Sequence, residues 1–259
     1  MGNHMPQKTI QIIGLNHIPE IKPGANLANI LIKGIEKQKL KIENKDIIVI
    51  AQKIVSKAEG QIINLNHIKP STFATIFSLK SGKDARLIEL ILQQSKQIIR
   101  MDMDKGILIT ETIHGLICAN AGIDSSNVEG SEYVTLLPDN PDLSAKKLYY
   151  GISSFFPNFS IPVIISDTFG RPWRNGQNNV AIGIYGMDPI KDYRNTKDVF
   201  GNTLSNTMIT IADEIAAAAE LVMGKTNRIP IVLIKGINTS FSETTINTIF
   251  RNPSEDLFR

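Results

Sequence analysis

The sequence predicts a mixed α+β fold, because short apolar runs typical of strands interleave with amphipathic segments in no regular strand–helix–strand order. A second observation is the pair of apolar runs joined by His114-Gly115, which predicts a hairpin and therefore antiparallel pairing. We expect one domain over residues 6–259, with two lobes joined near the turn-rich segment 138–143. Residues 1–5, MGNHM, are interpreted as a cloning remnant and not as part of the fold.

The predicted strands are short, apolar and rich in β-branched residues. The segment 46–51 is almost continuously apolar, as in strands that are buried on both faces. The predicted strands cover residues 9–13, 46–51, 106–112, 115–119, 161–165, 181–185 and 230–234.

The predicted helices carry apolar residues at helical spacing and recognisable end signals. Asn26 is expected to cap a helix that starts at Leu27, and Gly224 is expected to end an alanine-rich helix. The predicted helices cover residues 27–35, 84–99, 144–150 and 208–223, and the polar segments 52–60, 120–130 and 167–179 are predicted as loops.

Composition restricts the classes of function. Hydrophobic residues make up 42% of the 259 residues, which excludes a disordered chain and a coiled coil. The net charge of +3 is too balanced to indicate nucleic-acid binding, and no apolar run approaches the ~18–20 residues of a membrane span. The single cysteine, Cys118, cannot form an intrachain disulfide, so we expect a cytoplasmic protein.

Two aspartates are the candidate metal ligands. Asp124 lies in the segment NAGIDSSN, and Asp167 follows an apolar strand directly, with the Thr168 hydroxyl beside it. Carboxylate and hydroxyl oxygens suit Mg²⁺ or Mn²⁺, and ligand sites favour the ends of strands. The alternative is that both aspartates are turn residues that hydrogen-bond their own backbone.

Arg171 and Arg174 are the candidate catalytic residues. They follow Asp167 in a glycine-containing segment, and a guanidinium can bind phosphate oxygens through two parallel hydrogen bonds. Next to a metal carboxylate, such residues would hold a polyphosphate or the group being transferred. The alternative is a solvated basic loop.

Other segments carry weaker signals. Lys57, in VSKAEG, could contact phosphate, although an exposed loop lysine is the commoner case. The segment MGKTNR is not a P-loop, because Ala219 stands where the first glycine is required. Cys118 lies among apolar residues and is interpreted as a small core residue.

Several segments together resemble one family over nearly the whole chain, from about Ile10 to Gly236. They are VSKAEG, NAGIDSSN, SDTFGRPWRNG, IADEIAAAAELVMG and IPIVLIKGI. In this order and spacing they resemble the coenzyme F-420:gamma-glutamyl ligase family. The resemblance implies an enzyme that joins L-glutamate to the carboxylate of a deazaflavin precursor. It also implies GTP as co-substrate, two divalent ions (Mg²⁺ or Mn²⁺) per subunit, K⁺, and an intertwined homodimer with a gamma-glutamyl ligase-like fold.

The resemblance also assigns positions. It places the metal ligands at Asp124, Asp167 and Thr168, the last at a second metal. It places the nucleotide contacts at Ile18, Pro19, Glu20, Ile21, Gln52, Lys57, Asn127, Met223, Gly224, Lys225, Thr226, Asn227, Arg228 and Ile229. The 223–229 segment has fewer glycines than the family pattern, so the choice between GTP and ATP stays open.

The working hypothesis is an acid–amino-acid ligase that acts through an acyl phosphate, with nucleotide, L-glutamate and an acidic acceptor as its partners. One alternative is the same chemistry on another acidic acceptor. Another is a metal- and nucleotide-binding protein without turnover.

Overall fold

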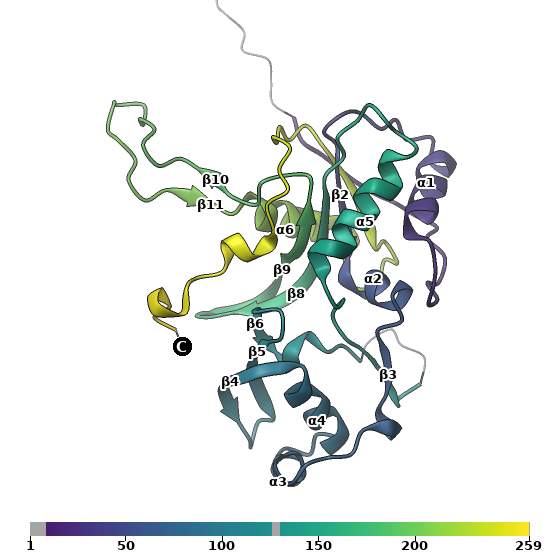
Figure 1. The fold of residues 1–259 in the computed structure, drawn as a ribbon, viewed down its shortest axis with the longest axis vertical. Coiled ribbons are helices and arrows are strands. Elements are labelled where there is room, and N and C mark those ends of the chain that lie inside the picture. Colours follow the sequence, from purple (N-terminus) through teal and green to yellow (C-terminus); the bar gives the residue numbers. More distant parts are fainter. Residues whose placement is uncertain (1–8, 126–129, 259) are drawn as a thin grey trace, which may run out of the picture.

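The computed structural model describes residues 9–125 and 130–258, and its main lobe is built on one mixed sheet (Figure 1). The strand order is β1-β12-β2-β8-β9, in which β2 and β8 are parallel and the other neighbours are antiparallel. The strands span Gln11–Gly14 (β1), Ile231–Lys235 (β12), Ile47–Ala51 (β2), Val163–Arg171 (β8) and Arg174–Tyr185 (β9). This mixture of helices and mixed sheet agrees with the predicted α+β class.

Helices cover both faces of the main sheet (Figure 1). Along β2, Ile48 and Ile50 pack in one core cluster, whereas Ile47 and Val49 pack in the other, because successive strand residues point to opposite faces. The first face is covered by α1 (Leu27–Lys37), α2 (Gln52–Ala58) and α5 (Pro141–Ser153), and the second by α6 (Ile211–Met223).

A second lobe lies beneath the main sheet in Figure 1 and has core clusters of its own. The chain leaves α2 for this lobe through β3 and returns to α5 through β7, and these two strands pair antiparallel. The lobe contains β3 (Ile62–Asn64), α3 (Thr72–Ser81), α4 (Ala85–Gln93), β4 (Ser95–Asp102), β5 (Ile107–Thr112), β6 (Ile117–Ala119) and β7 (Tyr133–Thr135). The return to α5 falls next to the predicted joint at 138–143.

The end signals of two helices are confirmed. The Asn26 side chain accepts a hydrogen bond from the Asn29 amide at 3.0 Å and so caps α1. Gly224 ends α6 with a φ of +55°, and its amide donates to the carbonyl of Glu220. The helix begins at Ile211 and not at residue 208, because Met208–Ile209 forms the short strand β11.

Three further predicted segments are wrong in whole or in part. Residues 52–58 form α2 and not a loop, because Ile54 and Val55 turn into the core despite their polar neighbours. Residues 167–179 form the continuation of the β8–β9 hairpin, in which polar residues occupy the exposed strand ends. The helix predicted over 84–99 ends at Gln93, and residues 95–102 form β4. Helix α3 carries no clear apolar periodicity and was not predicted.

A long arm projects from the main lobe between β9 and α6 (Figure 1). Strands β10 (Lys191–Asp192) and β11 (Met208–Ile209) pair at its base. Val199 and Phe200, in the segment between them, are 93% and 87% exposed. The arm therefore exposes large apolar side chains in this single chain. No helix among the described residues is long and apolar enough to cross a membrane.

Candidate functional site

The strand registers bring several of the predicted site segments to one edge of the main sheet. Gly14, the last residue of β1, pairs with Val232, so the 15–21 loop leaves the sheet next to the loop that precedes β12. Ile231 pairs with Ile50, and Ala51 pairs with Ser166. The chain therefore leaves the sheet for α2 at this same edge. Asp167 and Thr168 lie beside this point, where β8 continues past the end of β2 and pairs only with β9. Carboxyl ends of parallel strands are a common place for ligand sites, and β2 and β8 supply such a pair here.

Asp124 is held by its backbone beside this edge. Its amide and carbonyl exchange hydrogen bonds with Thr135 at 3.0 and 2.8 Å, in an isolated antiparallel bridge. Its carboxylate forms an ion pair with Lys53 of α2, with 2.7 Å between Nζ and Oδ2. The backbone bonds therefore fix the residue while its side chain faces a cation. Lys53 was not predicted as a site residue, because residues 52–60 were expected to form a loop.

Asp167 has a perturbed acidity. The pKa of its carboxyl is raised from an ordinary value of 3.8 to about 6, mainly by burial and in smaller part by the negative charge of Asp124. A hydrogen bond from the Thr168 amide and the charges of Lys225 and Lys53 act in the opposite direction. The two aspartates are thus close enough to repel each other, and a cation between them would relieve that repulsion.

The chemistry of this pair fits a hard divalent ion, because both groups are carboxylates and their two negative charges exceed the single positive charge of Lys53. Among the described residues there is no group of three or more His, Cys, Asp or Glu side chains that could hold a metal. An ion at Asp124 and Asp167 would therefore need water or phosphate oxygens to complete its coordination, as Mg²⁺ sites usually do.

Thr168 belongs to a different set of contacts. Its hydroxyl donates to Oδ1 of Asn179 at 2.6 Å and accepts from Nζ of Lys225. Asn179 donates in turn to Glu220 Oε2 at 2.9 Å, and Lys225 lies 3.1 Å from Glu220 Oε1. Neighbouring strand residues point to opposite faces, so the side chains of Asp167 and Thr168 diverge. Asn179 and Glu220 were not predicted, because their role depends on the hairpin and on α6 meeting in space.

Two of the predicted nucleotide contacts in the N-terminal half, Lys57 and Gln52, have side chains that hydrogen-bond other parts of the protein. Lys57 is only 8% exposed, and its ammonium donates to the carboxylate of Glu20, which joins α2 to the 15–24 loop. Gln52 is buried and donates to the Ser56 hydroxyl at 2.8 Å and to the carbonyl of Leu136 at 2.9 Å. The side chain of Gln52 is therefore engaged inside the protein. Asn127 lies outside the described residues.

The 223–229 segment lies at the same edge of the main sheet as the two aspartates. Met223, the last residue of α6, is buried. Ile229 and Val222 pack so close to Gly14 that a Cβ on Gly14 would lie 2.7 Å from Ile229. Arg228 adopts a left-handed conformation with a φ of +54°. The structure thus places this segment between the 15–21 loop and the Asp167-Thr168 segment, as a turn that follows a helix and not as a P-loop.

Arg171 and Arg174 lie away from the two aspartates. They face each other at the tip of the β8–β9 hairpin, across a turn made by Pro172 and Trp173. Arg171 is four residues beyond Asp167, which corresponds to about 13 Å along a strand. Both arginines are exposed, and the Trp173 ring packs at 4.8 Å from the ring of Phe258. Their catalytic role stays a prediction, and it requires a ligand or a second chain that reaches the hairpin tip.

Cys118 is a core residue, as predicted. Burial is the main reason that the pKa of its thiol is raised to about 12, and the nearby charge of Asp167 adds to this shift. The side chain is therefore a neutral thiol at physiological pH. It does not supply a nucleophile.

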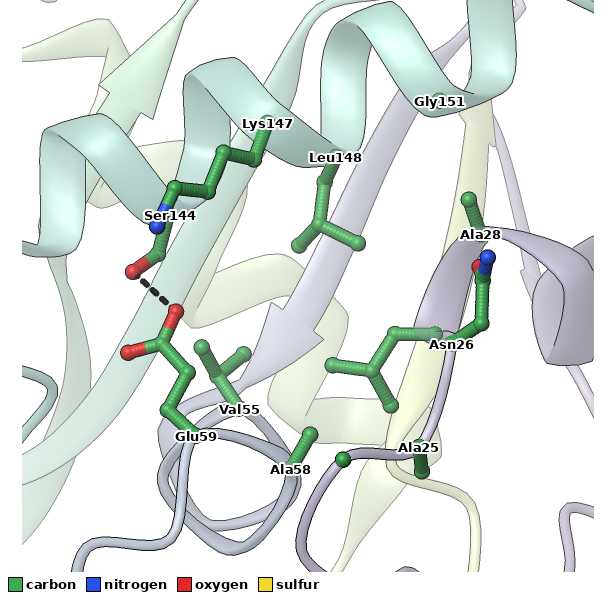
Figure 2. A pocket seen from close by; sticks show the side chains of 12 residues that line it. Ala25, Asn26, Ala28, Val55, Ala58, Glu59, Ser144, Lys147, Leu148 and Gly151 are labelled. Carbon is green, nitrogen blue, oxygen red and sulfur yellow. Dashed lines mark hydrogen bonds between the residues drawn. The ribbon is translucent and has the colours of Figure 1, made fainter.

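Two cavities lie apart from the aspartates. The first, of about 380 Å³, lies between the start of α1, α2 and α5, and Figure 2 shows the Ser144 hydroxyl pointing at Glu59 across it. The second, of about 530 Å³, lies at the start of α5 and is lined by Lys96, His114 and Lys146 among others. Neither of these two cavities is lined by Asp124 or Asp167.

The fold and site define an α+β protein in which two neighbouring carboxylates and several loops are gathered at one sheet edge. The family model described as F420-0:Gamma-glutamyl ligase matches residues 16–236. A coenzyme F420:L-glutamate ligase of Methanothermobacter thermautotrophicus is 41% identical over 96% of this chain and 99% of its own length. A protein of the same name from Methanocaldococcus jannaschii is 38% identical over 98% of each chain. The chain belongs to the F420-0:gamma-glutamyl ligase family.

Proposed function

We propose that this chain joins L-glutamate to the carboxylate of a coenzyme F420 precursor, in a reaction driven by a nucleoside triphosphate, GTP in the first instance. The observation that carries the proposal is the common sheet edge, where paired aspartates, two lysines and three chain segments converge. Relatives that cover nearly the whole chain carry the name coenzyme F420:L-glutamate ligase, which supports this acceptor.

The proposed reaction has two steps. The acceptor carboxylate attacks the γ-phosphorus, and the nucleoside diphosphate leaves, so that an acyl phosphate forms. The α-amine of L-glutamate then attacks the acyl carbon, phosphate leaves, and an amide results. No covalent enzyme intermediate is needed, which agrees with the neutral, buried thiol of Cys118.

The residues of this chain have separate tasks in that scheme. Asp124 and Asp167 would hold a divalent ion, which when bound neutralises charge on the phosphates. Lys53 and Lys57 add positive charge along α2, and the backbones of the 15–21 and 223–229 segments enclose the nucleotide. Arg171 and Arg174, at the hairpin tip, would contact the acceptor or the transferring group.

We also propose a homodimer. The exposed apolar side chains of Val199 and Phe200 on the projecting arm support this proposal, because burial of such residues against a second copy would be favourable. The arm is long and thin, so a partner chain is the natural source of a surface that would cover it.

Purified protein incubated with GTP, Mn²⁺, L-glutamate and the deazaflavin precursor tests the proposed function. The expected product is one glutamyl residue heavier by mass spectrometry, with phosphate release that requires both L-glutamate and acceptor. Turnover with a different acidic acceptor only would replace the substrate assignment. Saturable nucleotide binding without any phosphate release would overturn the ligase proposal.

A further inference from the structure

We propose that the ammonium group of Lys225 takes the place of a second divalent ion in this site, so that each chain holds one such ion and not two. The proposal rests on the proposed function, because it concerns the charge balance of the same nucleotide site. It differs from the expectation of two ions that the family resemblance implies.

The contacts around Thr168 form a closed ring. Lys225 donates to the Thr168 hydroxyl, Thr168 donates to Asn179, Asn179 donates to Glu220, and Glu220 pairs with Lys225. A threonine hydroxyl has one hydrogen to donate, and here Asn179 receives it. The Thr168 oxygen could bind a metal only through its two lone pairs, and the ammonium group occupies one of them. Asn179 is only 3% exposed and anchors one side of the ring in the protein interior, whereas the Lys225 side chain is 61% exposed.

The net charge around the two aspartates differs from the net charge around Thr168. Asp124, Asp167 and Lys53 together carry one net negative charge when both carboxyls are ionised. The charge of Lys225 also reaches Asp167, but Glu220 pairs with it, so a divalent ion is still attracted to the two aspartates. Glu220 and Lys225 cancel each other, and Thr168 and Asn179 are neutral. A second divalent ion would meet no net negative charge at Thr168 and would be repelled by an ammonium group on the same hydroxyl.

The expected ligands therefore fit one ion and not the second. An ammonium group and a metal ion compete for the same oxygen lone pairs, and Lys225 is tethered to the site by its own backbone. The 223–229 segment is also next to the predicted nucleotide loops, so the Lys225 charge lies where it could face a phosphate group. In this chain a side chain supplies the positive charge that a second metal ion would otherwise bring.

Counting bound Mn²⁺ tests the proposal without relying on activity. Free and bound Mn²⁺ are measured by electron paramagnetic resonance during titration of the protein with a non-hydrolysable GTP analogue present, in K⁺-free buffer. We expect one Mn²⁺ per chain for the unmodified protein and two for Lys225→Gln, which keeps a polar side chain but loses the charge. Lys225→Arg and the distant surface variant Lys80→Gln should each bind one. Circular dichroism and the melting temperature establish that every variant is folded.

The possible outcomes separate this proposal from the proposed function. Two Mn²⁺ in the unmodified protein would overturn the role of Lys225 and leave the ligase proposal intact. One Mn²⁺ in both the unmodified protein and Lys225→Gln would also overturn it, because charge would then not be the cause. No bound Mn²⁺ would overturn both this inference and the assignment of Asp124 and Asp167, whereas loss of the single ion in Asp167→Asn would support both.

Discussion

The Asp167→Asn substitution should change stability in opposite directions with and without metal. Burial and the charge of Asp124 raise the pKa of Asp167 from 3.8 to about 6, so ionisation of this carboxyl lowers the stability of the folded protein. At 1.36 kcal/mol per pKa unit, the ionised carboxyl costs up to about 3 kcal/mol of folding free energy above pH 7. Asparagine has the same size and no charge, so it removes this cost.

The sign follows from proton linkage. Between pH 3.8 and about 6 the folded state binds more protons at this position than the unfolded state, so stability falls as the pH rises through that window. In metal-free buffer, Asp167→Asn should therefore be more stable than the unmodified protein at pH 7.5 and similar to it at pH 4. For a chain of this size, about 3 kcal/mol corresponds to roughly 6–12 °C in melting temperature.

The assay is thermal unfolding followed by circular dichroism in EDTA at both pH values, and again at pH 7.5 with Mn²⁺. With Mn²⁺ the order should reverse, because the unmodified protein gains binding energy and Asp167→Asn does not. A metal-free Asp167→Asn protein that melts below the unmodified protein at pH 7.5 would refute the reasoning. Equal stabilisation of both proteins by Mn²⁺ would refute the metal assignment separately.

Three further predictions concern residues outside the aspartate pair. Cys118→Ala should keep its turnover and lose on the order of 1 kcal/mol of stability, measured by urea unfolding; loss of turnover in a folded variant would indicate a thiol role. Arg171→Lys should lower turnover roughly ten- to a thousandfold with nucleotide affinity and melting temperature unchanged, and unchanged turnover would remove Arg171 from the catalytic residues. Phe200→Ser combined with Val199→Ser should shift the protein from dimer to monomer in sedimentation velocity, and an unchanged mass would exclude the arm as the contact.

The sequence predicted those parts of the fold whose signals are local. The Asn26 cap, the apolar run of β2 and the Gly224 stop depend only on neighbouring residues, and the structure confirms them. Helix α2 was missed because its polar residues, Gln52 and Lys57 among them, are buried by contacts with distant segments. Such tertiary contacts leave no periodic pattern in the chain.

In the candidate site, too, residues with a local sequence signal could be predicted, and residues placed by tertiary contacts could not. Asp124 and Asp167 could be selected because each follows a recognisable element, and the structure places them within electrostatic reach of each other. Lys53, Asn179 and Glu220 could not be selected, because their contacts depend on the registry of β8 with β9 and on the position of α6.

Asp124 and Asp167 belong to differently built parts of the molecule. Asp167 continues a strand of the main sheet, whereas Asp124 is bonded to Thr135 of β7, at the border of the lobe that has its own core clusters. An ion held by both carboxylates would cross-link the two lobes, in a chain whose single cysteine rules out an internal disulfide. Binding of the ion would then join the two lobes reversibly. We expect it to slow amide hydrogen exchange in β3 and β7, where the lobes meet.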